Sequence, residues 1–429
     1  MKSLPSKPAF STHYQALIIG GGSAGLAAAI ELKNQGIENI AILEKDFEPG
    51  GILQQCIHNG FGLQTFQEQL SGPEYAERFS SEVAKHHIPL FLHTTVTHLS
   101  SDGTIEAINP EQGVMHLSAD AILLAVGCYE RARGALNIPG SRPAGIYTAG
   151  QAQRYLNMEG CLVGKNVFIL GSGDIGLIMA RRMSLEGAKV LGVAEVCPYS
   201  NGLPRNLKQC LEDFDIPLYL SHTITNIFGT KRLEAIELSQ VDENRQKVAG
   251  TERILPVDTL LLSVGLIPEN HLADEAGLVM NPATKGPVVD ERYMTSVPGI
   301  FACGNGLHVH DLVDFVTLQA KRAAKGAAAY LHEKDHAYEV AYPVLAKGQT
   351  SYIVPGQLHP SLVQDKVEFF FRVKKPMENV TIRVKSEGIL LKKMRKKKMI
   401  PSEMERLSLD PTLLKTLKAP LEIEVVETE

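Results

Sequence analysis

The chain has 429 residues, 44% of them apolar and 21% charged, which is typical of a globular protein with two or three domains. Its formal net charge of −5 excludes general affinity for nucleic acid, and no apolar run is long enough to span a bilayer. The N-terminal stretch MKSLPSKPAFSTHYQ lacks the apolar segment of a signal peptide, so we expect a cytoplasmic protein.

The six cysteines contain no CxxC pair, and the two that are nearest in sequence, Cys197 and Cys210, are 13 residues apart. This spacing predicts no zinc or iron–sulfur cage, and we expect no metal site. In a long cytosolic chain, most cysteines are reduced and behave as small buried apolar residues. The other four are Cys56, Cys128, Cys161 and Cys303.

The first motif, GGGSAGLAAAIELKNQG, follows a predicted buried strand at residues 15–19. Gly20, Gly22 and Gly25 have the G-x-G-x-x-G spacing, which permits a tight turn, close approach of a pyrophosphate, and close packing of helix on strand. The alanine-rich run predicts a helix whose N-terminus faces the phosphates. A second strand ends at Glu44, whose carboxylate can accept hydrogen bonds from the ribose hydroxyls. The unit predicts a dinucleotide site, and the alternative is a glycine-rich turn without a ligand.

The same pattern returns after a second apolar strand at residues 166–170. Gly171, Gly173 and Gly176 repeat the spacing, and Glu195 lies 24 residues after the first of these glycines, as the acid of the first unit does. The repeat indicates two similar modules. A carboxylate at this position repels a 2′-phosphate, which favours NADH over NADPH. The alternative is a degenerate module that does not bind a nicotinamide nucleotide.

Three further stretches connect the two modules. A buried strand in AILLAVGCYERARGALNIPG ends at Gly127, and the strand in TLLLSVGLIPEN ends at Gly265. In TSVPGIFACGNGLHVHDLVDF, the strand GIFACGN precedes an alanine-rich predicted helix.

With these motifs in this order, residues 15 to about 333 resemble the flavoproteins with two dinucleotide-binding domains, the pyridine nucleotide–disulfide oxidoreductase superfamily. The resemblance implies that the first module binds FAD and that the second, inserted in the first, binds NAD(P)H. It also implies that the late strand holds the flavin ribitol. There, this chain has Asn305 where the family commonly has Asp, but an amide oxygen can still accept from a ribitol hydroxyl.

The resemblance implies which residues of this chain bind the two cofactors. The implied FAD-binding residues are Gly20, Gly22, Ser23, Ala24, Gly25, Glu44, Lys45, Gly51, Gln55, Val96, Ala125, Gly127, Gly304 and Asn305. The implied NAD-binding residues are Gly171, Gly173, Asp174, Ile175, Gly176, Glu195 and Gly265.

The stretch GGILQQCIHNG decides whether the chain has the redox dithiol of the disulfide reductases. In those relatives, two cysteines follow two glycines as G-G-x-C-x-x-x-x-C. Here Leu53 and His58 occupy the two cysteine positions and Cys56 occupies neither, so we expect no redox-active dithiol. We expect Cys56 to pack beside the flavin, because a reactive thiol needs a lowered pKa.

Two histidines are the candidate acid–base residues, because an unperturbed imidazole titrates near neutrality. His58 belongs to the stretch just described, and His310 follows the ribitol strand together with His308. The alternatives are a structural role for His58 and, for His308 and His310, a loop position at the start of the next helix.

A narrower resemblance rests on the strings GGILQQCIHNGFG, GPEYAERF, RPAGIYTAGQAQRYLN, GSGDIGLIMARRMSLEGAKV, RNLKQCLEDFDIPL and CGNGLHVHDLVDFV. They resemble the NAD/FAD-dependent oxidoreductases associated with bacterial anaerobic-type glycerol-3-phosphate dehydrogenases. More distantly, they are similar to the flavin subunits of hydrogen cyanide synthase, opine oxidase and heteromeric proline dehydrogenase or sarcosine oxidase. The resemblance implies a subunit that passes electrons between NAD(H) and a partner's flavin or another acceptor.

Two other functions stay open at this point. One is a flavin subunit of an amine, amino-acid or glycerol-3-phosphate dehydrogenase or oxidase whose second module does not use NADH. The other is a nucleotide-bound assembly or sensor subunit without catalytic activity.

The predicted fold class is α/β, with two Rossmann-like dinucleotide-binding domains, the second inserted in the first, and a small C-terminal β-rich domain. We expect the FAD-binding domain at residues 1–130 and 266–335, the NAD(H)-binding domain at 131–265, and the β-rich domain at 336–429. The last assignment rests on alternating β-branched and aromatic residues in VEFFFRVK, NVTIRVK and LEIEVVE.

A strongly basic run, KKMRKKK at residues 392–398, lies within this last domain. It is typical of a solvated strand edge that discourages aggregation. The alternative is a dock for an acidic partner subunit, such as a dehydrogenase, or for an anionic lipid surface. The sequence leaves a homo-oligomer open.

Overall fold

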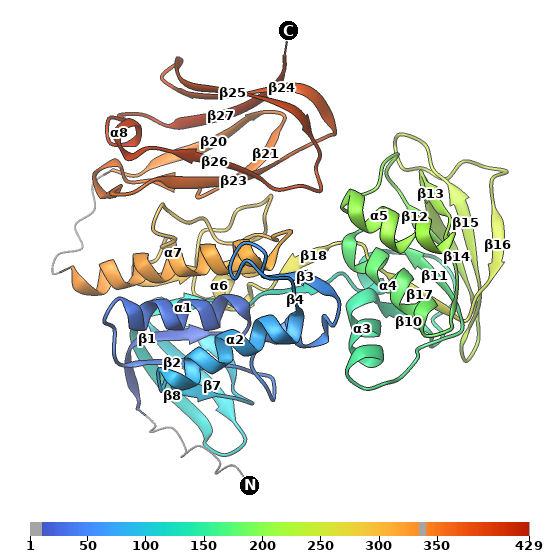
Figure 1. The fold of residues 1–429 in the computed structure, drawn as a ribbon, viewed down its shortest axis with the longest axis horizontal. Helices are drawn as coiled ribbons and strands as arrows, with labels where there is room; N and C mark the ends of the chain where they lie inside the picture. The colour runs from blue at the N-terminus through green and yellow to red at the C-terminus, as the bar shows by residue number, and fades with distance from the viewer. Residues whose placement is uncertain (1–10, 334–339, 429) are drawn as a thin grey trace. The chain divides into compact units, whose positions relative to one another are not determined.

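The computed structural model describes residues 11–333 and 340–428 (Figure 1). Tertiary contacts divide the chain into two units, of which the first is Met1–Cys128 with Pro268–Glu429 and the second is Tyr129–Ile267. The second unit therefore interrupts the first in the sequence.

Two short strands, β9 (Cys128–Glu130) and β18 (Leu266–Pro268), lie where the chain crosses between the units. The crossings fall beside the expected boundaries at 130/131 and 265/266. The expected boundary at 335/336 lies outside the described residues.

A mostly parallel sheet forms the core of the first unit, in the order β5-β2-β1-β8, with β19 beside the end of β8. The first half of β8 pairs with antiparallel β7, and its second half is parallel to β1 and β19. The parallel strands are apolar and buried because helices cover them. The strands are β1 (His13–Ile19), β2 (Ile40–Leu43), β5 (Leu90–Phe91), β6 (Thr95–Leu99), β7 (Thr104–Asn109), β8 (Gly113–Leu124) and β19 (Ile300–Ala302).

Two alanine-rich helices, α1 (Ser23–Asn34) and α7 (Val313–His332), pack beside one another on this sheet (Figure 1). Alanine favours the helix and, fully buried at five positions of α7, leaves room for the close approach. The helix α2 (Gly72–Lys85) begins at a capping box, in which the Ser71 N–H donates to the Glu74 carboxylate at 2.8 Å. The remaining elements are η1 (Gly51–Gln55), β3 (Asn59–Phe61), β4 (Leu70–Ser71), α6 (His271–Glu275) and η4 (Gly304–Gly306).

The second unit contains its own parallel sheet, in the order β10-β17-β11-β12-β13, with an antiparallel sheet of β14, β15 and β16. Apolar side chains between these two sheets and beneath the helices form its cores. The strands are β10 (Ile146–Thr148), β11 (Asn166–Leu170), β12 (Lys189–Glu195), β13 (Leu218–Leu220), β14 (His222–Gly229), β15 (Leu233–Gln240), β16 (Arg253–Pro256) and β17 (Thr259–Leu262). The helical segments are η2 (Arg133–Ala135), α3 (Ala149–Asn157), α4 (Asp174–Leu185), α5 (Pro204–Cys210) and η3 (Glu212–Phe214).

The C-terminal region of the first unit consists of two sheets, in the orders β22-β20-β27-β24-β25 and β21-β23-β26, around a core of its own. The three predicted strands are present as β23, β24 and β27, and the basic run lies in β25 at the edge of the larger sheet. The elements are β20 (Tyr342–Gly348), β21 (Thr350–Val354), β22 (Gln357–Leu358), η5 (Pro360–Leu362), β23 (Val367–Val373), β24 (Met377–Ser386), β25 (Ile389–Met399), β26 (Glu405–Leu409), α8 (Pro411–Leu414) and β27 (Leu421–Glu427).

The predicted α/β fold class with a β-rich C-terminal region is confirmed. Within the described ranges, no helix is both long enough and apolar enough to cross a membrane.

The packing of α1 on β1 gives a prediction about stability. A Cβ at Gly25 would lie 1.8 Å from the Gly20 carbonyl oxygen, whereas a Cβ at Gly134 would meet no atom within 4 Å. We expect Gly25→Ala to lower the free energy of unfolding by at least about 2 kcal/mol, because the helix must move away from the turn. The matched change Gly134→Ala should leave the urea midpoint nearly unchanged. Equal midpoints for the two variants would contradict the close packing.

Candidate nucleotide-binding sites

The first glycine turn joins β1 to α1 and has a shape that only glycine permits. Gly20 has φ +107°, and a Cβ there would lie 2.4 Å from the Ala125 carbonyl oxygen. A Cβ at Gly25 would lie closer still to Gly20, as described above. Steric contacts with the protein itself therefore explain the first and third glycines of the motif.

The middle glycine has a different role. A Cβ at Gly22 would meet no protein atom within 4 Å, so space is open on this side of the turn. Gly22 is also the N-cap of α1, and no side chain caps this helix start. The amide groups of Ser23 and Ala24 in the first turn of the helix are thus available to an anion. The open space and the uncapped amides fit a pyrophosphate.

Glu44, at the end of β2, is held against the same turn. Its Oε2 accepts a hydrogen bond from the Gly21 N–H at 2.5 Å, and its Oε1 accepts from the Asp46 N–H at 2.8 Å. The residue is buried, but each carboxylate oxygen has further lone pairs. The carboxylate is therefore fixed in place and can still accept from ribose hydroxyls.

The stretch that begins at Gly50 lies against this turn. The Gly50 N–H donates to the Gly21 carbonyl at 2.8 Å, and a Cβ at Gly51 would come within 3.3 Å of the Gly22 Cα. Gln55, at the end of η1, is buried, whereas Lys45 is exposed. The structure thus brings the Gly50–Gly51 pair to the predicted FAD turn.

Two more of the predicted FAD positions come from the carboxyl ends of neighbouring parallel strands. The Ala125 N–H donates to the Ile19 carbonyl at 2.9 Å, which places the segment after β8 beside the glycine turn. Gly304, after β19, has φ +68°, and a Cβ there would lie 2.9 Å from the Ala24 Cβ. Ligands of open α/β sheets bind at this edge.

Two further positions of the prediction, Gly127 and Val96, differ in how far the structure supports them. Gly127, two residues beyond Ala125, has φ +76° in the same connection. Val96 lies in β6, on the antiparallel hairpin, where it packs against the core of the unit. The place of Val96 in the FAD site stays a prediction.

The ribitol strand leads into a network built around Gln319 of α7. Its Oε1 accepts from the Gly304 N–H at 2.8 Å and lies 3.0 Å from His310 Nε2. Its Nε2 lies 2.7 Å from His308 Nε2, and the Asn305 side chain accepts from the His310 N–H at 3.0 Å. Asn305 therefore orients the histidine loop, and its oxygen keeps a second lone pair for a hydroxyl.

Burial determines the charge of these two histidines. It lowers the pKa of His310 to about 4, and burial followed by the charge of His310 and Arg372 holds the pKa of His308 well below its usual value. Both imidazoles are therefore neutral at pH 7. Neutrality favours a hydrogen-bonding role for His310 over proton transfer at that pH, and its catalytic role stays a prediction.

Cys56 and His58 of the GGILQQCIHNG stretch are half-buried, whereas Ile52, Ile57 and Asn59 are exposed. The His58 ring packs against Phe61 with centroids 5.1 Å apart, and its acid–base role stays a prediction. Burial raises the pKa of the Cys56 thiol to about 12, and Sγ lies 3.3 Å from the Ile52 carbonyl oxygen. A raised pKa suppresses the thiolate, which supports the packing role that we expected for Cys56.

The second unit repeats the geometry of the first turn. Gly171 has φ +96°, and a Cβ there would lie 2.0 Å from the Ser263 carbonyl oxygen. Glu195 Oε2 accepts from the Ser172 N–H at 3.1 Å and from its hydroxyl at 2.7 Å, and Oε1 accepts from the Cys197 N–H at 3.0 Å. Glu195 therefore makes the same bond to the second turn that Glu44 makes to the first, with the amide that follows the first glycine.

The second turn is nevertheless more crowded. Ser263 Oγ accepts from the Gly176 N–H at 3.0 Å and lies 3.3 Å from the position of a Cβ at Gly173. Asp174 begins α4, where its Oδ1 accepts from the Leu203 N–H at 2.9 Å and brings negative charge to the helix start. One first-turn amide is thus already satisfied, which weakens the attraction for phosphate relative to the first turn.

Two other predicted residues of this unit lie beside the turn. Ile175 is half-buried in α4, and Gly265 has φ +98° two residues after Ser263.

The chain belongs to the family described as pyridine nucleotide-disulphide oxidoreductase, whose sequence profile matches residues 14–328. The protein is therefore an oxidoreductase of a family that binds FAD and NAD(P). The predicted superfamily, flavoprotein class and enzymatic nature are confirmed.

Particular relatives are distant. An opine oxidase subunit of Agrobacterium tumefaciens (strain Ach5) is 26% identical over 318 residues, which are 69% of this chain and 62% of the relative. NADH oxidase of Methanocaldococcus jannaschii is 26% identical over 356 residues, which are 77% of this chain and 72% of the relative. Thioredoxin reductase of T. acidophilum has the same fold over 74% of this chain and 99% of its own, with 22% identity and a TM-score of 0.61. The resemblance to opine oxidase and hydrogen cyanide synthase subunits is confirmed, although the chain spans less than two thirds of that opine oxidase relative.

Sequence reasoning missed two residues of α7 that organise the FAD side. Gln319 holds the histidine loop, and the buried Asp314 accepts from the N–H groups of Thr65 and Gly62 at 2.8 and 3.2 Å. Their only signal in the sequence is a polar side chain on the alanine-rich face of a buried helix. A buried group of Asp290, Glu291 and His359 was also missed.

The open side of the first turn gives a prediction that separates binding from folding. Gly22→Ala adds a methyl group where the protein leaves space, so we expect the stability of the apoprotein to stay unchanged. The methyl group should weaken FAD binding by tenfold or more, because it occupies the approach to the turn. Titration of deflavinated protein with FAD, together with the Tm of the apoprotein, measures both effects. Undiminished affinity would show that the turn does not hold the pyrophosphate.

The neutral histidines give a prediction about pH. Because the pKa of His310 is about 4 in the folded protein, only the unfolded chain takes up its proton as the pH falls from about 6.5 to about 4. Stability should therefore decline across this window, by about 3 kcal/mol for His310 alone. His310→Asn should flatten the decline, whereas His116→Asn, at an exposed site, should not. Parallel stability curves for wild type and His310→Asn would exclude a buried neutral imidazole.

Proposed function

We propose that the protein is an FAD-dependent oxidoreductase that passes electrons between NAD(H) and a second acceptor, either a small molecule or the flavin of a partner subunit. The observation that carries the proposal is the repeated geometry of the two turns, each with an acid at the strand end bound to the amide after the first glycine. Two nucleotides can be held by the same device in one chain.

Different residues of the first unit would hold different parts of FAD. The uncapped start of α1 and the open face of Gly22 would hold the pyrophosphate of FAD, and Glu44 would hold its ribose. When bound, FAD supplies the acceptor and donor of a hydride. The neutral His308 and His310, with Gln319, would line the ribitol side and offer hydrogen-bonding groups there.

The crowded second turn supports an exchangeable nucleotide. Ser263 and Asp174 reduce the attraction of the start of α4 for phosphate, as a co-substrate that must leave requires. Glu195 is buried and its carboxylate is anchored by three hydrogen bonds, so a 2′-phosphate placed beside it would meet a fixed negative charge. This charge supports a preference for NADH over NADPH.

The electron route that we propose uses no redox-active dithiol. Leu53, at the first cysteine position of the disulfide reductases, is buried in the core, and His58 stands at the second. The thiol of Cys56 between them has a raised pKa. The second acceptor must then take electrons without a thiol–disulfide exchange in this stretch.

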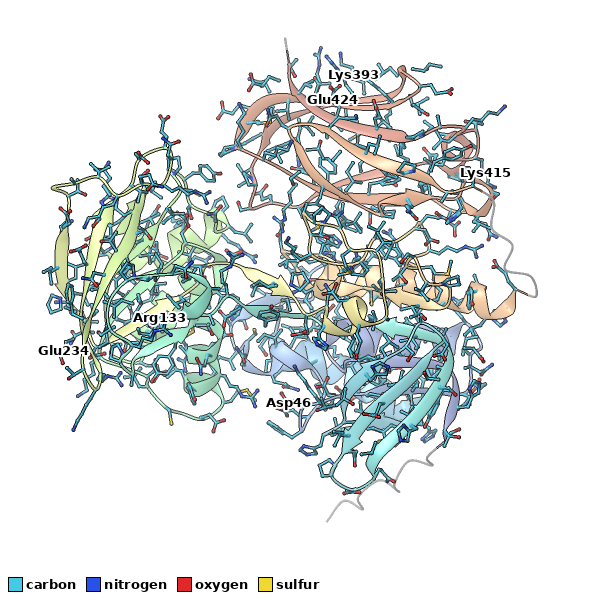
Figure 2. The ribbon with its side chains drawn as sticks, turned by 180° about the vertical axis from the view of Figure 1, so that it is seen from behind. Asp46, Arg133, Glu234, Lys393, Lys415 and Glu424 are labelled. Atoms are coloured by element: carbon cyan, nitrogen blue, oxygen red, sulfur yellow. The ribbon has the colours of Figure 1, made fainter. Side chains whose placement is uncertain are left out.

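We also propose that the acceptor belongs to a partner subunit, and that the complex works in the cytoplasm. The support is the similarity to a protein named as one subunit of opine oxidase, and the sequence resemblance to proteins associated with anaerobic-type glycerol-3-phosphate dehydrogenases. The basic run in β25 offers the partner a cationic edge, from which Lys393 projects (Figure 2). An amine or amino-acid dehydrogenase is the other candidate partner, and the chain itself could then be the flavin subunit.

An anaerobic titration tests the proposed function. NADH should bleach the flavin absorbance of the purified protein, and NADPH should do so at much higher concentrations. Bleaching by glycerol-3-phosphate or an amine, with NADH inert, would favour the alternative in which the second module is not a nicotinamide site. A colourless protein without turnover would contradict both.

The role of Glu195 can be tested with a matched pair of substitutions. Glu195→Gln should raise the KM for NADH about tenfold, because a hydrogen bond to a charged acceptor contributes about 1.5 kcal/mol or more. Glu234→Gln, at an exposed site of the same unit (Figure 2), should leave the KM unchanged. Unchanged KM in both variants would remove Glu195 from the ribose site.

A further inference from the structure

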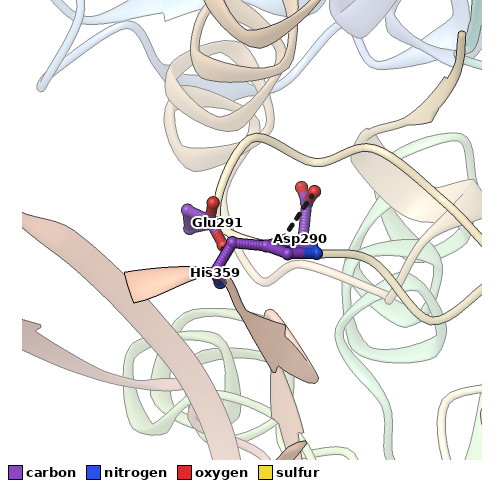
Figure 3. Close-up of side chains that lie close together, drawn as sticks. All are labelled: Asp290, Glu291 and His359. Atoms are coloured by element: carbon purple, nitrogen blue, oxygen red, sulfur yellow. Dashed lines mark hydrogen bonds and ion pairs between the residues drawn. The ribbon is translucent and has the colours of Figure 1, made fainter. Parts of the chain in front are cut away.

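Two carboxylates and an imidazole form a buried group that the proposed function does not use (Figure 3). Asp290 and Glu291 are consecutive residues of the loop before β19, and His359 precedes η5 in the C-terminal region. One potential ligand atom from each residue lies within 4.8 Å of the other two. The group therefore joins segments 68 residues apart within the first unit.

The spacing of the atoms suits a small cation. His359 Nδ1 lies 3.5 Å from Asp290 Oδ2 and 3.7 Å from the Glu291 carboxylate. Ligands of a tetrahedral ion bound at 2.0–2.2 Å lie about 3.4 Å from one another. The two distances from His359 are therefore close to those between ligands of one ion.

Each carboxylate is already oriented by backbone amides through one of its oxygens. Asp290 Oδ1 accepts from the N–H groups of Arg292 and Met294, both at 2.9 Å, which leaves Oδ2 facing the imidazole. Glu291 Oε2 accepts from the His359 N–H at 2.9 Å. Such outer hydrogen bonds fix the direction of metal ligands in known sites.

The two carboxylates of the group are deeply buried. The side chains of Asp290 and Glu291 are each only 3% exposed, and Glu291 Oε1 is buried without a hydrogen-bond partner among the described residues. The nearby guanidinium of Arg292 is engaged with Glu333 at 2.6 Å. Two carboxylates held this close together in a protein interior repel one another when both are charged, and a bound cation would relieve that repulsion.

We propose that Asp290, Glu291 and His359 bind one divalent first-row transition metal ion, with Zn²⁺ as the best candidate. One imidazole with two carboxylates is a ligand set for such an ion, whereas Mg²⁺ and Ca²⁺ prefer oxygen ligands alone. A water molecule or a second carboxylate oxygen would complete the shell. The ion fastens the His359 turn to the loop before β19, so its role is structural.

This site departs from the sequence-based expectation of no metal. That expectation considered cysteine cages, and the three ligands here come from a pair of acids and a distant histidine that form no sequence motif.

The experiment uses the full-length protein, freed of metal with a chelator and titrated with Zn²⁺ by calorimetry. We expect one ion per chain, with a Kd below about 1 μM, and a Tm that rises on Zn²⁺ addition. His359→Gln and Asp290→Asn should each weaken binding at least tenfold and remove the Tm rise. The control variant His116→Gln with Glu106→Gln removes an exposed histidine–glutamate pair and should change neither result.

X-ray absorption at the zinc edge keeps the proposal testable if the variants fail to fold. The wild-type protein with one equivalent of Zn²⁺ should show only nitrogen and oxygen neighbours near 2.0–2.1 Å. Sulfur neighbours would assign the ion to the cysteines and overturn the proposal. A metal-free protein that binds no Zn²⁺, with variants that only lose stability, would show an ion pair in place of a metal site. If NADH still bleaches the flavin of the metal-free protein and of the variants, the proposed function does not depend on whether the metal site exists.

Discussion

The bond between a strand-end carboxylate and the amide that follows the first glycine is the constraint on which both modules depend. It joins β1 to β2 at Gly21 and Glu44, and β11 to β12 at Ser172 and Glu195. The acid reaches this amide only when the helix between the two strands brings the second strand back beside the first in the observed parallel pairing. The bond therefore requires a strand–helix–strand segment of matching length in each module. It also holds a negative charge where a ribose hydroxyl can donate to it.

The two modules share this bond but differ in what surrounds it. In the first unit no side chain caps the helix start, and the Gly50 N–H donates to the turn at the Gly21 carbonyl. In the second unit Ser263 satisfies an amide and Asp174 adds charge at the helix start. A helix start whose amides are free for phosphate suits a resident cofactor, and one whose amides are partly satisfied suits a nucleotide that must leave. The proposal that FAD is resident and NAD(H) exchanges rests on this asymmetry.

The sequence predicts those parts of the structure that depend on the spacing of residues close together in the chain. The glycine turns, their acids and the helix α1 follow from residues within one βαβ unit, because sterics and periodicity act there over short distances. The Gln319 network and the group at Asp290, Glu291 and His359 join residues far apart in the chain, and no local rule specifies them. The charge state of His310 was likewise hidden, since burial by the rest of the unit sets its pKa.

The basic strand β25 has a consequence for the behaviour of the protein in solution. It is eleven residues long and ends the sheet, so its outer backbone groups have no strand partner within the described ranges. Like charges on two such edges repel, which keeps copies from pairing through them. The repulsion extends over about 10 Å at 0.1 M salt and shrinks to about 3 Å at 1 M. Concentrated salt therefore exposes this edge to self-association, and dilute buffer protects it.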